Sequence, residues 1–262
     1  MLDALSPARR RFVAVLAALA AAAVFAVVVG VVLNREPAVQ PVAQDEPGPV
    51  LLVPGYGGST GSLEVLAAAL RAAGRDAVVV PLAGDGTGDL RDEARVLDQA
   101  VDAALKRTGA ASVDVVGYSA GGVIARLWVA DFGGGNVARR VLTLGSPHHG
   151  TDLAGLAVDV APDTCPTACQ QLAADSDLLR RLNAGDETPA GPLWVSIWTS
   201  DDKVVVPPES AELRGALDFS VQSVCGSSPI QHGDLPRNPS VVALTIRELG
   251  ISTPSRPTAA DC

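Results

Sequence analysis

The stretch VDVVGYSAGG, residues 113–122, decides which fold this sequence predicts. Its first four residues, three of them valines, form a short apolar run that is typical of a strand buried on both faces. Glycines follow, and VIARLWVA after them has the composition of a helix. Gly-x-Ser-x-Gly at such a strand-to-helix turn is typical of an exposed nucleophilic serine, although an ordinary glycine-lined turn would read the same. Ser119 is therefore a candidate nucleophile.

Short apolar runs alternate with longer helical patterns along the rest of the chain. We expect strands over residues 50–53, 77–80, 113–116, 141–144, 193–198 and 219–224, and helices over 63–74, 88–109, 123–130 and 241–249. Continuous apolar strands separated by helices predict an α/β fold with a compact, doubly wound, mostly parallel sheet of about six strands. Residues 151–192 are too many for a simple loop and predict a helical cap or lid, the alternative being plain elaboration of the fold.

An uncharged segment precedes this domain. Residues 12–33 follow Arg9, Arg10 and Arg11, and as a helix they would rise about 33 Å, enough to cross a bilayer with the N-terminus in the cytoplasm. We expect residues 1–34 to be a signal anchor, the alternative being a signal peptide cleaved after Ala26 or Ala43. Residues 35–49 read as a Pro-rich linker. Residues 50–262 would then be an extracytoplasmic domain, anchored to the membrane or secreted.

Charge and cysteine content narrow the class of protein further. The formal net charge is −9, and no basic stripe with interleaved aromatics is present, so nucleic-acid binding is disfavoured. Four cysteines in an oxidising compartment predict two disulfides. The favoured pairing joins Cys165 to Cys169 and Cys225 to Cys262. The alternative, a zinc site with His148 and His149, is disfavoured because C-x-x-x-C lacks the usual ligand spacing.

A nucleophilic serine needs a general base, and the choice of histidine is narrow. The chain has three histidines, and on this kind of sheet the order is serine, acid, histidine. His148 and His149 follow the strand directly after the serine helix, which leaves no later strand to supply the acid before them. His232, in the loop SSPIQHGDLP, is therefore the expected base.

The acid and the oxyanion donors are expected on loops at the same edge of the sheet. Asp201 and Asp202 both follow the strand over 193–198 and compete for the acid, with Asp218 a weaker third choice. One oxyanion donor would be the N–H of Ala120, the residue after the nucleophile. The second would be the N–H of Tyr56 in the glycine-rich segment PGYGG, which follows the first strand.

Five segments together resemble the small secreted bacterial triacylglycerol lipases and esterases of the α/β-hydrolase superfamily: VLLVPGYGGS, VDVVGYSAGG, VLTLGSPHHGT, WTSDDKVVVP and QHGD. The likeness covers residues 50–249. It implies Ser119 as nucleophile and His232 as base, with Tyr56 and Ala120 as oxyanion donors. It favours Asp202 over Asp201, because the family's acid precedes one variable residue and two aliphatics. It also implies that PHHGT supports the site. Many relatives begin the oxyanion segment with His-Gly, whereas this chain has Pro54-Gly55.

The expected function is hydrolysis of lipid-like carboxylic esters through an acyl-enzyme, without metal or cofactor, by a monomer. The same triad would serve an acyltransferase or an esterase that acts on cell-envelope or polyester substrates. A non-catalytic surface binding protein with this fold is the alternative from another class, because fold alone does not imply function.

Overall fold

The computed structural model describes residues 7–33, 39–226 and 229–262, which fall into two compact units, Met1–Ala38 and Val39–Cys262. In the first unit, helix α1 covers Pro7–Leu33. Within the part of the chain that the structure describes, none of the helices combines the length and the apolar character that crossing a bilayer requires. The anchor expected over residues 12–33 stays a prediction, and residues 35–38 of the expected linker lie outside the described residues.

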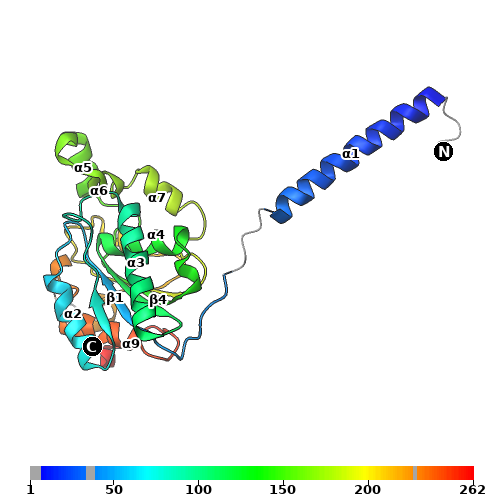
Figure 1. Ribbon diagram of the computed structural model, residues 1–262. Helices are drawn as coiled ribbons and strands as arrows, with labels where there is room; N and C mark the ends of the chain where they lie inside the picture. The colour runs from blue at the N-terminus through cyan, green and yellow to red at the C-terminus, as the bar shows by residue number, and fades with distance from the viewer. Residues whose placement is uncertain (1–6, 34–38, 227–228) are drawn as a thin grey trace. The chain divides into compact units, whose positions relative to one another are not determined.

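The second unit is built on one parallel sheet of six strands in the order β2-β1-β3-β4-β5-β6 (Figure 1). The strands are β1 Val50–Val53, β2 Ala77–Val79, β3 Val113–Tyr118, β4 Ala138–Leu144, β5 Leu193–Trp198 and β6 Leu217–Ser220. This confirms the predicted doubly wound α/β fold. The strand order reverses between β1 and β3, and the loops after these two strands therefore border the crevice where such folds bind ligands.

Helices cover both faces of the sheet. The apolar residues of β1 alternate between two cores: Leu51 and Val53 belong to one cluster, and Val50 and Leu52 belong to the other. The first cluster includes α3 (Leu90–Thr108) and α4 (Ala120–Asp131), which pack against each other, and the second includes α2 (Gly61–Ala72) and α9 (Pro239–Glu248). Because both faces are covered, the strands can be apolar throughout, which explains the sequence pattern.

The remaining helices are short and lie mostly in the loops at the carboxyl edge of the sheet. They are η2 Gly134–Asn136, α5 Asp152–Val160, η3 Pro162–Thr164, α6 Thr167–Gln171, α7 Asp177–Leu182, η4 Pro208–Ala211, α8 Gln222–Cys225, η5 His232–Asp234 and η6 Ala259–Asp261. The segment over 151–192 is thus helical, as predicted. Disulfides join Cys165 to Cys169 and Cys225 to Cys262, which is the pairing that the sequence favours.

Several boundaries differ from prediction, and two of them differ most. The last strand ends at Ser220 instead of residue 224, because Val221 starts the turn into α8. Val221 is apolar and buried in this turn, so the sequence pattern does not distinguish it from a strand residue. The folded unit begins at Val39 instead of residue 50, so residues 39–49 are part of the domain. Arg139 explains the second difference, since its guanidinium donates to the carbonyl of Gln44 at 2.9 Å.

Arg139 belongs to a buried charge cluster at the amino edge of the sheet. Its guanidinium lies 2.5 Å from the carboxylate of Asp114, and Arg75 binds the same carboxylate at 2.6 Å. Arg139 also donates to the carbonyls of Leu249 and Gly250. The cluster therefore ties strands β3 and β4 to the C-terminal segment, far from the edge that carries Ser119.

Candidate active site

Ser119 is held in a strained backbone conformation between β3 and α4. Its φ of 54° and ψ of −127° make it the one non-glycine residue with positive φ in the described part of the chain. A Cβ on Gly117 would come within 2.5 Å of the Gly121 carbonyl oxygen, and one on Gly121 would lie 2.2 Å from the Val53 carbonyl oxygen. Both glycines of the motif are therefore required by close backbone approach, which is how the turn presents the serine.

Two further glycines pack closely at this turn: Gly122, which sequence reasoning did not single out, and Gly55 of the segment PGYGG. A Cβ on Gly122 would lie 2.1 Å from the Ser146 hydroxyl oxygen, and one on Gly55 would lie 2.8 Å from the Ser119 Cβ. Gly55 thus lets the chain after β1 pass directly over the serine. The doubled glycine at the end of GYSAGG was the available signal for Gly122.

Ser119, His232 and Asp202 form a continuous hydrogen-bonded chain. The His232 Nδ1 lies 2.7 Å from Asp202 Oδ2, and its Nε2 lies 3.0 Å from Ser119 Oγ. Because a carboxylate can only accept, Nδ1 carries the proton and Nε2 is free to accept from the serine hydroxyl. His232 and Asp202 are each 6% exposed, so this chain of hydrogen bonds is shielded from water. The arrangement can remove a proton from Ser119.

The other oxygen of Asp202 determines how the carboxylate is oriented. Oδ1 accepts from the backbone N–H groups of Val204 at 2.8 Å and Val205 at 2.9 Å. These two hydrogen bonds stabilise the carboxylate and leave Oδ2 facing His232. The loop after Asp202 therefore fixes the orientation of this carboxylate, and the carboxylate in turn orients the His232 imidazole.

The two competing aspartates have other partners. Asp201 Oδ2 accepts from the backbone N–H of Ile230 at 3.3 Å, so it supports the loop that carries His232 instead of contacting the ring. Asp218 accepts from Trp198 Nε1 at 3.0 Å and from the Leu213 N–H at 3.0 Å, and burial raises its pKa. Of the three carboxylates, Asp202 is the one that the structure places against His232.

Tyr118, the first of the two variable residues of the motif, makes contacts with His232 that sequence reasoning missed. Its ring lies 5.1 Å from the His232 ring, centroid to centroid, and its hydroxyl donates to the His232 carbonyl at 3.3 Å. Burial, with the nearby Asp202 charge, raises the pKa of Tyr118 to about 12, so the hydroxyl stays a neutral donor. No pattern in the sequence marks it, because any residue fits that position of the motif.

The two expected oxyanion donors lie on the segments that flank Ser119. Ala120 is the first residue of α4, where backbone N–H groups have no acceptor within the helix. Tyr56 follows Gly55, which passes over the serine, and the turn around it is held by the N–H of Gly57 donating to the Gly86 carbonyl. The helix N-terminus adds partial positive charge at this position. Their role as oxyanion donors stays a prediction.

His148 and His149 have structural partners and do not contact Ser119. His148 is fully buried, with Nε2 3.1 Å from the Thr143 hydroxyl, and burial lowers its pKa well below the usual range, so it is neutral. His149 lies between the Ser210 carbonyl and the Glu187 carboxylate. The alternative zinc site is wrong for these residues, because the sulfurs of Cys165 and Cys169 are bonded to each other.

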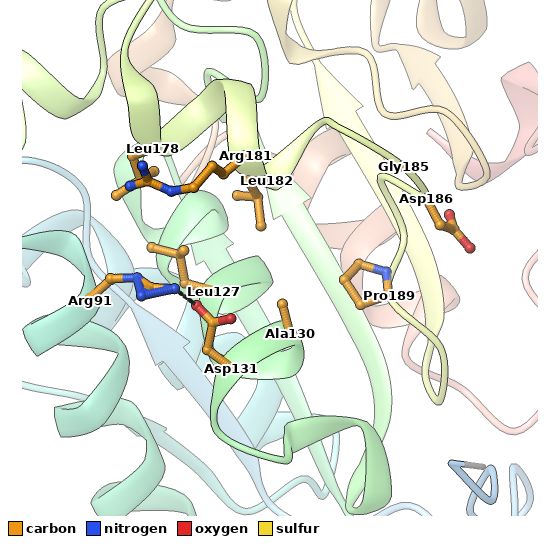
Figure 2. Close-up of a pocket in the computed structure, with 10 residues that line it drawn as sticks. All are labelled: Arg91, Leu127, Ala130, Asp131, Leu178, Arg181, Leu182, Gly185, Asp186 and Pro189. Carbon is orange, nitrogen blue, oxygen red and sulfur yellow. Dashed lines mark hydrogen bonds and ion pairs between the residues drawn. The ribbon is translucent and has the colours of Figure 1, made fainter. Parts of the chain in front are cut away.

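A cavity of about 220 Å³ opens beside Ser119 and is lined mainly by apolar side chains. A larger cavity of about 360 Å³ lies between α3, α4 and α7 (Figure 2). There Arg91 and Asp131 point toward each other and form an ion pair. Asp131 is the last residue of α4, which has 12 residues and starts beside Ser119, so this cavity lies about 18 Å from the serine along the helix. No serine, cysteine or histidine is among its lining residues. The candidate active site is therefore the smaller cavity.

The parallel six-stranded sheet and the serine on its strained strand-to-helix turn define an α/β-hydrolase. The model of the family described as lipase (class 2) matches residues 93–228, which is just over half of the chain. The chain belongs to this family.

Solved structures with the same fold include two lipases. Aspergillus fumigatus lipase B matches with a TM-score of 0.65 and 20% identity, over 81% of this chain and 55% of that one. The mature form of Bacillus licheniformis lipase BlEst2 matches with a TM-score of 0.64 and 18% identity, over 82% of this chain and 96% of that one. The chain thus spans about half the length of the fungal lipase and nearly all of the mature bacterial one.

Proposed function

We propose that this protein is a serine carboxylic ester hydrolase that acts on lipid-like esters. The observation that carries the proposal is the hydrogen-bonded chain from Asp202 through His232 to Ser119, which ends at an apolar cavity. Membership of the lipase family supports it. The names of the two structural neighbours, both lipases, agree with it.

In the proposed reaction, His232 Nε2 accepts the proton of the Ser119 hydroxyl as Oγ attacks the ester carbonyl. The tetrahedral oxyanion is stabilised by the backbone N–H groups of Tyr56 and Ala120. His232 then gives its proton to the departing alcohol, and an acyl-enzyme remains. Water, deprotonated by the same imidazole, attacks this ester and releases the carboxylic acid and Ser119. Asp202 holds the imidazole with its proton on Nδ1 throughout.

Ser119→Ala tests this function, with Ser223→Ala as the matched control, because Ser223 is an exposed serine on α8 outside the site. We expect Ser119→Ala to lose at least about 10³-fold in kcat on p-nitrophenyl butyrate and to lose labelling by a fluorophosphonate. Ser223→Ala should keep both the hydrolysis of p-nitrophenyl butyrate and the labelling by the fluorophosphonate. A folded Ser119→Ala protein that hydrolyses the ester at the wild-type rate would refute the proposal.

We further propose that the enzyme works outside the cytoplasm, tethered by residues 12–33, as a monomer. Support comes from the uncharged segment after three arginines and from the two disulfides, which persist in oxidising compartments. Membrane fractionation, N-terminal sequencing and light scattering test these three points. If a shortened chain is recovered in the soluble fraction, residues 12–33 belong to a cleaved signal peptide and the proposed tether is wrong.

A further inference from the structure

The cavity beside Ser119 is walled largely by the segment that interrupts the strand rhythm. Five of its lining residues come from residues 151–172, and the loop after Asp202 supplies two more. The lining is Tyr56, Ser119, Pro147, Thr151, Leu153, Ala154, Cys169, Leu172, Val204 and Val205. Building on the proposed function, we propose that this wall binds the acyl chain of the ester, and that Ala154 and Leu172 limit its length to short and medium chains.

The chemistry of the lining selects an alkyl chain. None of the lining side chains carries a charge. The hydroxyl of Thr151 is already satisfied, since it donates to the Val204 carbonyl at 2.7 Å and accepts from the Val206 N–H at 3.1 Å. A sugar or phosphate group placed here would find only the hydroxyls of Tyr56 and Ser119 to replace its hydrogen bonds to water. An alkyl chain loses none and gains from leaving water.

The size of the cavity sets a length. At about 30 Å³ for each non-hydrogen atom, the share that a water molecule has in the liquid, a cavity of about 220 Å³ holds about seven such atoms. Butyrate and octanoate esters bracket this number. A palmitate chain would extend past the cavity, where Leu153 is 48% exposed, and much of it would stay in water. We therefore expect little gain in binding beyond octanoate.

The wall is held by contacts at several points, so it has little freedom to widen. The Cys165–Cys169 disulfide braces the start of α6. The N–H of Ala168 donates to the Thr87 carbonyl at 3.1 Å, and the N–H of Thr151 donates to the Leu172 carbonyl at 3.0 Å. The two length-limiting side chains are themselves buried, Ala154 at 8% and Leu172 at 6% exposure.

The proposal is tested by measuring how kcat/KM depends on acyl-chain length in two variants, one that fills the cavity and one that enlarges it. kcat/KM is measured on p-nitrophenyl acetate, butyrate, octanoate, dodecanoate and palmitate at submicellar concentrations. Wild type should peak at butyrate or octanoate. Ala154→Phe fills the cavity and should lower the octanoate-to-acetate ratio by about tenfold or more, whereas Leu172→Ala should raise the dodecanoate-to-butyrate ratio. Leu156→Ala is the control, because Leu156 lies on α5 but is 59% exposed and does not line the cavity.

The outcomes separate this inference from the proposed function. Two results would overturn the proposal that this wall binds the acyl chain, while the enzyme remains an esterase. One is a wild-type kcat/KM that rises steadily up to palmitate. The other is that Ala154→Phe and Leu172→Ala leave their kcat/KM ratios the same as in Leu156→Ala. If Ala154→Phe does not fold, the Leu172→Ala ratio decides alone. Wild-type protein that neither hydrolyses acetate nor reacts with a fluorophosphonate overturns the proposed function, and the inference falls with it.

Discussion

Replacing Asp202 by asparagine should disable the triad while leaving its shape almost unchanged. The backbone N–H groups of Val204 and Val205 both point at Oδ1, so the asparagine oxygen must stay there to accept them. The amide NH₂ then faces His232 Nδ1, which can only accept from it. The imidazole proton moves to Nε2, 3.0 Å from the Ser119 oxygen, and the base is lost.

The expected cost follows from this change of tautomer. In serine proteases the equivalent substitution lowers kcat by about 10⁴-fold, which corresponds to about 5 kcal/mol of transition-state stabilisation. Asp201→Asn is the matched neighbour, because Asp201 binds the Ile230 N–H and an amide oxygen can still accept that bond. We expect it to keep kcat/KM within about tenfold of wild type, with a stability loss of about 1 kcal/mol.

The assay is kcat and KM on p-nitrophenyl butyrate for wild type, Asp202→Asn and Asp201→Asn, with urea unfolding of each. Asp202→Asn should lower kcat and leave KM and stability nearly unchanged. Equal losses in the two variants, or an Asp202→Asn enzyme within tenfold of wild type, would refute the assignment of Asp202 and the tautomer argument with it.

Two further predictions concern folding stability. Gly121→Ala should destabilise the fold by about 3 kcal/mol or more in urea unfolding, because its Cβ would lie 2.2 Å from the Val53 carbonyl oxygen, whereas Gly155→Ala, with no atom within 4 Å, should stabilise α5 by up to about 1 kcal/mol. His148 is neutral when folded and protonates near pH 6.5 when unfolded, so the unfolded chain binds more protons and stability falls as pH drops below about 6.5, by up to about 1.4 kcal/mol per unit. The free energy of unfolding of His148→Gln should lack this dependence on pH. If the free energies of unfolding of wild type and His148→Gln change in parallel from pH 7 to pH 5, the prediction is wrong.

Features set by neighbouring residues were predictable from the sequence, and those set by distant partners were not. Strands β1 and β5 have the predicted bounds, because the apolar run that forms each strand and the turn that ends it are both visible in adjacent residues. Strand β4 begins earlier than predicted because its first charged residues, Arg139 and Arg140, are buried. Their partners are Asp114 and carbonyls near the C-terminus, which no local pattern reveals.

The candidate site shows the same division. Ser119, Asp202 and His232 are distant in sequence, yet their order was predictable because β3, β5 and β6 are parallel and end at one edge of the sheet. What chain order leaves open is the direction of a side chain. Asp201 and Asp202 are adjacent, equally charged and follow the same strand, and they differ in the groups that they meet once the loop has folded. The family resemblance favours Asp202 from the residues that follow it, but chain order alone cannot show that the folded loop turns this carboxylate toward His232, and this is why the paired asparagine variants test the site more directly than any residue pattern.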